Sequence, residues 1–214
     1  MKRDLVIYGA WYFGDVAAEL AAELGWNVLG RIDPEPPAHL QPLDCFPSGA
    51  VCFVAIGDNS RRHYVTERLE SNSRRFISLF HPTASISPSA RIGVGSYIGE
   101  HAVVRTDSTL GRGVVVNAGA VISHHSKIGD FVLVGPNAAI ASRGIVGAGS
   151  LVGVGACMRP GCVVGEWCTI GAGAVVINDI SREATVLGNP AKPIYSGETG
   201  KREAQSNWTS NKLW

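Results

Sequence analysis

An apolar side chain returns at every sixth residue from Phe80 to Val176 without interruption. The series is Phe80, Ile86, Ile92, Ile98, Val104, Leu110, Val116, Ile122, Ile128, Val134, Ile140, Val146, Val152, Met158, Val164, Ile170 and Val176. Only 45% of the chain is hydrophobic, so chance does not explain the run, and a fixed period is the signature of a repeat architecture. The repeat therefore determines a large part of the fold.

The other columns of the hexad describe a short strand followed by a corner. Small residues usually occupy the position four after each apolar residue, and Gly recurs one position after it. The four prolines of the segment all lie two positions after an apolar residue: Pro82, Pro88, Pro136 and Pro160. Because proline has no N–H to donate to a strand ladder, this column must lie at a bend. Three hexads then make one triangular coil, and parallel strands stack about 4.8 Å apart between coils.

The segment before the repeat, residues 1–79, predicts a small α/β domain. Strands are expected at 4–10, 27–33 and 51–57, and helices at 14–24 and 60–71. This alternation implies a parallel, Rossmann-like sheet with a ligand site at the carboxyl ends of its strands. Residues 80–195 then form the prism, and 196–214 form a polar tail.

The composition argues against several classes of function. A net charge of +1 with 17% charged residues provides no basic surface for nucleic acid. The chain begins a strand almost at once and has no run of about 18 apolar residues, so neither a signal peptide nor a membrane span is expected. Its five cysteines are odd in number, and Cys162 and Cys168 occupy small-residue positions of the repeat. We therefore expect reduced thiols in a cytoplasmic protein, without disulfides or a metal site.

Particular segments resemble a known family. The repeats IGVGSY, IGDFVL, VGVGAC and IGAGAV resemble those of the hexapeptide acyltransferases. The segments VIYGA, VAIGDN, HPTASISPSA, NAGAVISHHSKIGDF and GNPAKPI are similar to one branch: bacterial N-acetyltransferases of nucleotide-linked amino sugars, with the related sialic acid O-acetyltransferases. The resemblance covers roughly residues 4–195. It implies a left-handed parallel β-helix, a homotrimer, a nucleotide sugar on the front domain and acetyl-CoA in the groove between two prisms.

His124 stands where the resembling family has its catalytic base. It lies two positions after Ile122, in the corner column, so its ring is expected to point outward. A histidine is more often a structural residue, but the corner position together with the motif favours a base. An imidazole can take a proton from an amine or hydroxyl as that atom attacks a thioester carbonyl.

Further residues match family positions around the base. Ser142 lies eighteen residues after His124, one coil along the same corner, and the resemblance implies that its backbone N–H faces the thioester oxygen. Asn117 matches a family position beside the base, with an amide that closes its own turn as the equal alternative. His125 and Leu133 stand where the family commonly has an acid and a histidine, so what orients His124 is left open.

The resemblance places the acceptor sugar on the front domain. Gly9 begins the first turn, and Trp11 and Tyr12 follow where the family usually has further glycine. A Trp there blocks the approach of a diphosphate or stacks on the ligand, and both aromatics are equally compatible with the domain interface. Four more residues match family positions for the nucleotide. Asp33 would contact the nucleobase or ribose, Asp58 and Asn59 would contact the ligand from a turn, and Arg62 would bind a phosphate. Each of the four could equally be a turn residue or a solvated charge: Asp33, Asp58, Asn59 and Arg62.

The late corners of the prism carry the residues expected at acetyl-CoA. Arg143, Arg159 and Lys192 stand where the pantetheine arm and the phosphates would lie, together with Ser142. Surface cations are usually only solvated, which is the alternative for all three cations. No cysteine lies near His124 in the repeat, so direct transfer is favoured over an acyl-enzyme.

Several functions remain open on the sequence. The leading one is acetyl transfer from acetyl-CoA to the amino group of a nucleotide-linked deoxy-amino sugar by direct attack, with a histidine as general base. O-acetylation of a sugar hydroxyl, as in sialic acid, is the alternative. A zinc carbonic anhydrase is disfavoured because the histidines lack a close His-x4-His pair. A purely structural prism is also disfavoured, because it does not explain the presence of a complete front domain.

Overall fold

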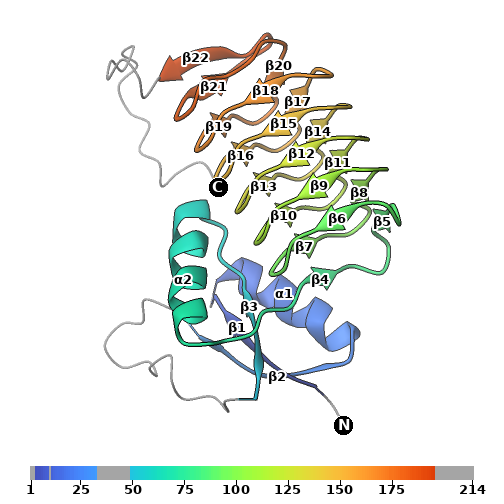
Figure 1. Ribbon diagram of the computed structural model, residues 1–214, viewed down its shortest axis with the longest axis vertical. Helices are drawn as coiled ribbons and strands as arrows, with labels where there is room; N and C mark the ends of the chain where they lie inside the picture. The colour runs from blue at the N-terminus through green and yellow to red at the C-terminus, as the bar shows by residue number, and fades with distance from the viewer. Residues whose placement is uncertain (1–2, 10, 33–48, 196–214) are drawn as a thin grey trace.

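The computed structural model describes residues 3–9, 11–32 and 49–195 (Figure 1). The predictions for Asp33 and for the tail 196–214 lie outside the described residues. Figure 1 shows a stack of short strands that rises from a small unit of two helices and three strands. Neither helix in the described part of the chain has the length and apolar character needed to cross a bilayer.

The repeat folds into a parallel β-helix with three faces. The first face is β4 Leu79–Phe80, β7 Tyr97–Ile98, β10 Val115–Val116, β13 Leu133–Val134, β16 Leu151–Val152, β19 Thr169–Ile170, β21 Thr185–Leu187 and, antiparallel at the end, β22 Lys192–Tyr195. The second face is β5 Ser85–Ile86, β8 Val103–Val104, β11 Val121–Ile122, β14 Ala139–Ile140, β17 Cys157–Met158 and β20 Val175–Val176. The third face is β6 Arg91–Ile92, β9 Thr109–Leu110, β12 Lys127–Ile128, β15 Ile145–Val146 and β18 Val163–Val164.

The register of the prism confirms the coil of three hexads. Residues eighteen apart are paired, as Val116 is with Val134 and Val152 is with Ile170. The inward residues of the hexad form one continuous core, in which these four valine and isoleucine side chains are fully buried. A side chain at the sixth position therefore always points inward, which is why the periodicity never slips.

Corners join the faces and stack into three edges. The first edge lies between the first and second faces, the second edge between the second and third, and the third edge between the third and first. All four prolines of the repeat occupy turns in these corners, as their missing N–H requires.

A three-stranded parallel sheet and two helices form the front unit. Its elements are β1 Arg3–Tyr8, α1 Tyr12–Glu23, β2 Trp26–Ile32, β3 Val51–Val54 and α2 Asn59–Ser71, and the strand order is β2-β1-β3. Gly9 follows β1 directly, and Gly14 lies in the first turn of α1. A Cβ on Gly9 would collide with the backbone oxygen of Ala55, and one on Gly14 would collide with that of Gly9. Only glycine allows so close an approach.

The front unit packs on the first face and along the third edge. Tyr97, Val115 and Leu133 point outward from the first face, yet they are buried against residues of β1 and α1. The Phe13 ring meets the Tyr97 ring edge-on at 5.2 Å. Corner residues of the second edge such as His124, Arg143 and Arg159, in contrast, stay exposed. The second edge is therefore open to a ligand or to another chain, as are the exposed corners of the first edge.

Candidate active site

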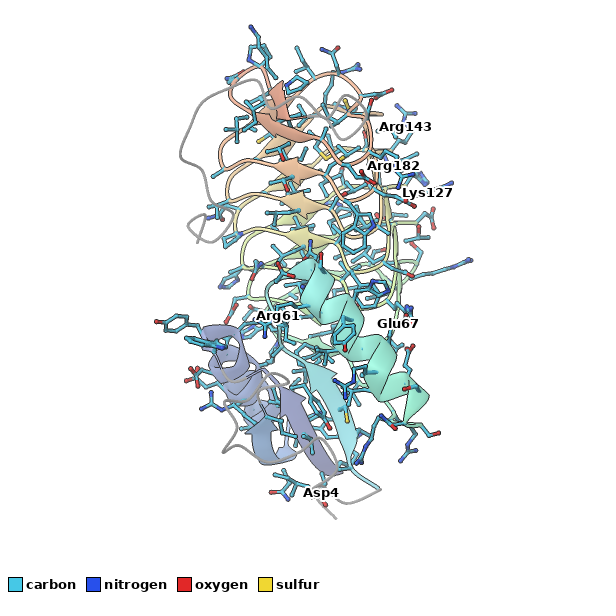
Figure 2. The ribbon with its side chains drawn as sticks, turned by 90° about the vertical axis from the view of Figure 1, so that its left-hand side faces the viewer. Asp4, Arg61, Glu67, Lys127, Arg143 and Arg182 are labelled. Atoms are coloured by element: carbon cyan, nitrogen blue, oxygen red, sulfur yellow. The ribbon has the colours of Figure 1, made fainter. Side chains whose placement is uncertain are left out.

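Four of the predicted site residues share the second edge. The exposed side chain of His124 follows β11, Ser142 and Arg143 lie on the next coil, and Arg159 lies on the coil after that. The Arg143 N–H donates to the backbone oxygen of His124 at 3.0 Å, which holds the two coils in register. Figure 2 shows Arg143 on the side of the prism turned away from α1. The expected placement is therefore present, while the roles of these residues stay predictions.

Several backbone N–H groups on the second edge do not donate to a backbone oxygen of the described residues. Thr106, His124 and Ser142 each lie two positions after an inward residue, and Pro88 and Pro160 fill the same position on this edge. Within the described residues, none of these amides donates to a backbone oxygen. An outward N–H held by a rigid coil can stabilise a developing oxyanion with little reorganisation. The Ser142 amide therefore has no backbone acceptor among the described residues, and its place at the thioester oxygen stays a prediction.

The ring of His124 is contacted by a second histidine. The His124 and His125 rings meet edge-on, with centroids 5.2 Å apart and an interplanar angle of 89°. His125 in turn places its Nδ1 3.7 Å from a carboxylate oxygen of Asp107. Sequence reasoning missed Asp107. The available signal was its spacing of eighteen residues from His125, which puts the two side chains at the same corner on successive coils.

Asn117 and Lys192 do not join the second edge within one chain. Asn117 follows β10 and therefore lies on the first edge, at the opposite end of β11 from His124. Its side-chain nitrogen donates to the backbone oxygen of Val134 at 3.2 Å. Within one chain a face of the prism separates Asn117 from His124, so a place for Asn117 beside the base stays a prediction for a contact between two chains. Lys192 begins β22, which pairs with β21 beyond the last coil.

The two aromatic residues of the first turn are exposed. Trp11 is 70% exposed and Tyr12 is 84% exposed, so the interpretation of these side chains as interface core is wrong. Gly9, the buried glycine before them, serves the close packing of the chain after β1 against Ala55. Asp58 forms the N-cap of α2, and its carboxylate accepts from the Arg61 backbone N–H at 2.8 Å. Asp58 therefore serves as a structural turn residue, which was the alternative to ligand binding, because an N-cap carboxylate satisfies an otherwise unpaired helix N–H.

Arg62 is not placed to bind phosphate. Its side chain is 1% exposed, and all five of its N–H donors are used inside the protein. Two of them reach across the domain boundary, from Nε to the Gly113 oxygen at 3.0 Å and from Nη2 to the Phe131 oxygen at 2.8 Å. Burial lowers the pKa of Arg62 to about 9, against the opposing effect of Asp58, so the guanidinium still carries its charge at neutral pH. The predicted phosphate ligand is instead a buried clamp between the two units.

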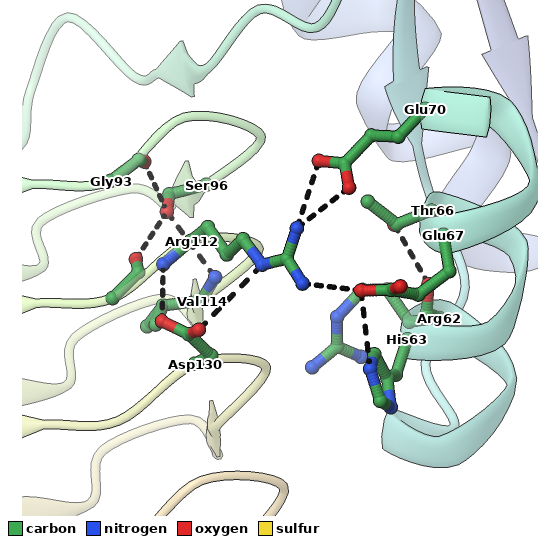
Figure 3. Close-up of polar contacts among 11 residues, drawn as sticks. Arg62, His63, Thr66, Glu67, Glu70, Gly93, Ser96, Arg112, Val114 and Asp130 are labelled. Atoms are coloured by element: carbon green, nitrogen blue, oxygen red, sulfur yellow. Dashed lines mark hydrogen bonds and ion pairs between the residues drawn. The ribbon is translucent and has the colours of Figure 1, made fainter. Parts of the chain in front are cut away.

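Asn59 belongs to the same seam. Its side-chain nitrogen donates to the Gly149 and Ser150 oxygens at 3.0 Å each, and its oxygen accepts from Arg62. The prediction that Asn59 binds substrate is therefore corrected, because both of its N–H donors are committed to the third edge. Figure 3 shows the outer part of this seam, where the guanidinium of Arg112 meets the carboxylates of Glu67 and Glu70 on α2.

Solved structures identify the fold and its relatives, although no protein-family profile matches the chain. The acetyltransferase domain of PglB from Neisseria gonorrhoeae is 36% identical, with a TM-score of 0.82, over 90% of this chain and 100% of that one. Perosamine N-acetyltransferase from Caulobacter crescentus is 28% identical, with a TM-score of 0.83, over 92% of this chain and 98% of that one. The chain belongs to the hexapeptide-repeat sugar N-acetyltransferases.

Among proteins of curated function, this chain is similar to UDP-N-acetylbacillosamine N-acetyltransferase from Bacillus subtilis, with 38% identity over 63 residues. That match spans 29% of this chain and 29% of the relative. The PglB domain has also been solved in complex with acetyl coenzyme A, and the perosamine enzyme, as a histidine-to-asparagine variant, in complex with CoA and GDP-perosamine. Membership in this acyltransferase family replaces the carbonic anhydrase and passive-prism interpretations.

Proposed function

We propose that the protein transfers an acetyl group from acetyl-CoA to the amino group of a nucleotide-linked deoxy-amino sugar. The observation that carries this proposal is the 36% identity to an acetyltransferase domain over that domain's full length. Two further observations support it: relatives have been solved with acetyl coenzyme A and with CoA plus GDP-perosamine, and His124 lies exposed on the open second edge.

In the proposed reaction the neutral amine attacks the thioester carbonyl carbon directly. His124 takes the proton that the nitrogen loses as the N–C bond forms, while the carbonyl oxygen becomes an oxyanion facing the Ser142 N–H. Collapse of the tetrahedral intermediate breaks the C–S bond, and the leaving CoA thiolate regains a proton from the His124 imidazolium. The products are an acetamido sugar and free CoA, and no group of the protein is acylated.

We further propose a homotrimer in which each cofactor site lies between two prisms. The second face carries small or half-buried outward side chains, among them Val103, Val121 and Ala139, which suit close contact with a neighbouring chain. Such packing sets the first edge of one chain against the second edge of the next. Asn117 of one chain would then approach His124 of its neighbour, and Arg143, Arg159 and Lys192 would line the same groove further along the prism for the CoA phosphates.

The front unit is proposed to be a Rossmann-like domain that holds the nucleotide of the acceptor. Its loops after β1 and β3 lie at the carboxyl ends of parallel strands, where such sheets bind ligands. Gly9, Trp11, Tyr12 and Asp58 belong to or border these loops, and Asp33 follows the third such strand end. Further glycine would allow the backbone to contact the ligand. In this chain the two exposed aromatic side chains would provide a stacking surface for the ligand instead.

Acceptor chemistry provides the test of the proposed function. Purified protein is expected to release CoA thiol from acetyl-CoA when a nucleotide-linked amino sugar is present, and not with the same sugar already N-acetylated. The acetyl group of the product should survive hydroxylamine, because it is an amide. Turnover only with hydroxyl acceptors, giving a hydroxylamine-labile ester, would instead establish the O-acetyltransferase alternative. Absence of thiol release with every amino and hydroxyl acceptor would contradict both.

Replacing Trp11 with alanine is expected to raise KM for the nucleotide sugar about tenfold and to leave KM for acetyl-CoA unchanged. Stacking a base on an aromatic side chain contributes about 1–3 kcal/mol, and Trp11 is exposed where the nucleotide is proposed to lie. Steady-state kinetics with each substrate varied in turn measures both constants. Tyr64→Ala is the matched control, since Tyr64 is an exposed aromatic on α2. Equal effects of the two substitutions would argue against a stacking role for Trp11.

A further inference from the structure

The second edge contains a row of polar side chains beside His124. Ser89, Asp107, His125 and Arg143 occupy the same corner position on four successive coils. The Ser89 hydroxyl oxygen accepts from the Asp107 backbone N–H at 3.0 Å, and the His125 N–H donates to the Thr106 oxygen at 2.9 Å. These bonds fix the backbones from which the carboxylate of Asp107 and the ring of His125 project toward each other.

Two contacts connect Asp107 to the proposed base. A carboxylate oxygen of Asp107 lies 3.7 Å from Nδ1 of His125, and the His125 ring meets the His124 ring edge-on with centroids 5.2 Å apart. The resembling family commonly carries an acid directly after the base, and this chain has His125 there. The carboxylate is thus absent from the sequence neighbour but present one coil away.

We propose that Asp107 and His125 act together as positioning residues for His124. The proposal rests on the proposed role of His124 as general base. Asp107 fixes the orientation of the His125 ring, and the edge of that ring limits the rotation of His124, so that one nitrogen stays aimed at the acceptor. No proton passes to Asp107, whose charge also offsets the imidazolium that forms on His124 during the attack.

Other charges around His125 set the size of the expected effect. Arg143 flanks it from the next coil, Lys127 lies two residues further along the chain, and Arg105 precedes Asp107 by two residues. The side chains of His125 and Asp107 are both 55% exposed, so solvent screens their interaction. We therefore expect a loss of about three- to tenfold in kcat when the pair is broken, well below the loss expected for the base itself.

The test is a cycle of substitutions that the backbone tolerates. Asp107 and His125 have φ values of +54° and +58°, a region that glycine and asparagine adopt readily, and Asn137 has φ +55° at the same position of its hexad. Asp107→Gly and His125→Asn are each expected to lower kcat with both KM values unchanged. The double variant should be no slower than the slower single variant, because both substitutions break one unit. Asp107→Asn retains an acceptor oxygen and should fall between Asp107→Gly and the wild type.

The matched control is Glu183→Gln. Glu183 has φ +58°, like Asp107 and His125, and it also lies three positions after an inward residue, but on the third edge. The substitution therefore removes one negative charge at a corner that is not in contact with His125. Crystal structures of the wild type and Asp107→Gly provide a readout independent of rate: the edge-on contact of the two histidine rings should be lost in the variant.

Three results would overturn the inference: wild-type kcat in Asp107→Gly, losses that multiply in the double variant, or a change confined to KM. If His124→Ala is inactive while Asp107→Gly is normal, only this inference fails. If His124→Ala retains full turnover, the base is elsewhere, so this inference and the role of His124 fail together while the proposed acetyl transfer stands.

Discussion

Replacing His124 with alanine is expected to lower kcat for acetyl transfer at least about 100-fold and to leave the fold intact. The side chain is exposed at a corner, so its removal opens no cavity in the prism core. The bond that links this coil to the next is made by the backbone oxygen of His124, which alanine keeps. The loss should therefore appear in the chemical step, measured by single-turnover transfer with both substrates saturating.

Glu166→Ala is the matched control for this substitution. Glu166 is exposed and also lies two positions after an inward residue, but on the third edge. It should retain the wild-type rate. Both variants should unfold at the wild-type temperature, which separates a loss of base from a loss of structure. Ordinary turnover in His124→Ala would exclude it as the base while leaving the family assignment in place.

The prism could be predicted from the sequence because its rule is local and repeated. Each hexad contributes one inward side chain and one corner, so counting in steps of eighteen places His124 and Ser142 on one edge without any structure. The same count separates Asn117 from His124, which are seven residues apart and therefore lie at different corners. It also brings Asp107 beside His125. The family motif instead groups Asn117 with His124, because a motif does not distinguish neighbours in one chain from neighbours across an interface.

The seam between the units could not be predicted from the sequence. Arg62 follows the turn at Asp58 and reads as a surface cation at the start of a helix. Its partners at Gly113 and Phe131 lie 51 and 69 residues away, and they contribute backbone oxygens. Every residue has such an oxygen, so no side-chain pattern marks these partners. Only the position of α2 along the third edge reveals that the cation is buried.

Replacing Arg62 with methionine is expected to lower the free energy of unfolding by about 3–5 kcal/mol, because several buried oxygens lose their donors at once. Methionine fills part of the space but has no N–H, so the buried oxygens of Ile56, Gly113 and Phe131 lose the donors that Arg62 provides. Arg68→Met is the control on the same helix, because Arg68 is exposed, and a change within about 0.5 kcal/mol is expected there. Denaturant unfolding at one fixed protein concentration measures both, since assembly shifts the apparent stability.

A second variant keeps this prediction testable if Arg62→Met does not fold. Asn59→Ala removes the two N–H groups that reach the Gly149 and Ser150 oxygens, but it leaves the guanidinium in place. A smaller loss of about 1–2 kcal/mol is expected, because Asn59 is only half-buried and water can replace part of what it donates. Limited proteolysis of this variant should cut the front unit before the prism, since the seam is what joins them. Wild-type stability in both variants would mean that the apolar contacts of Tyr97, Val115 and Leu133 hold the front unit without the polar seam.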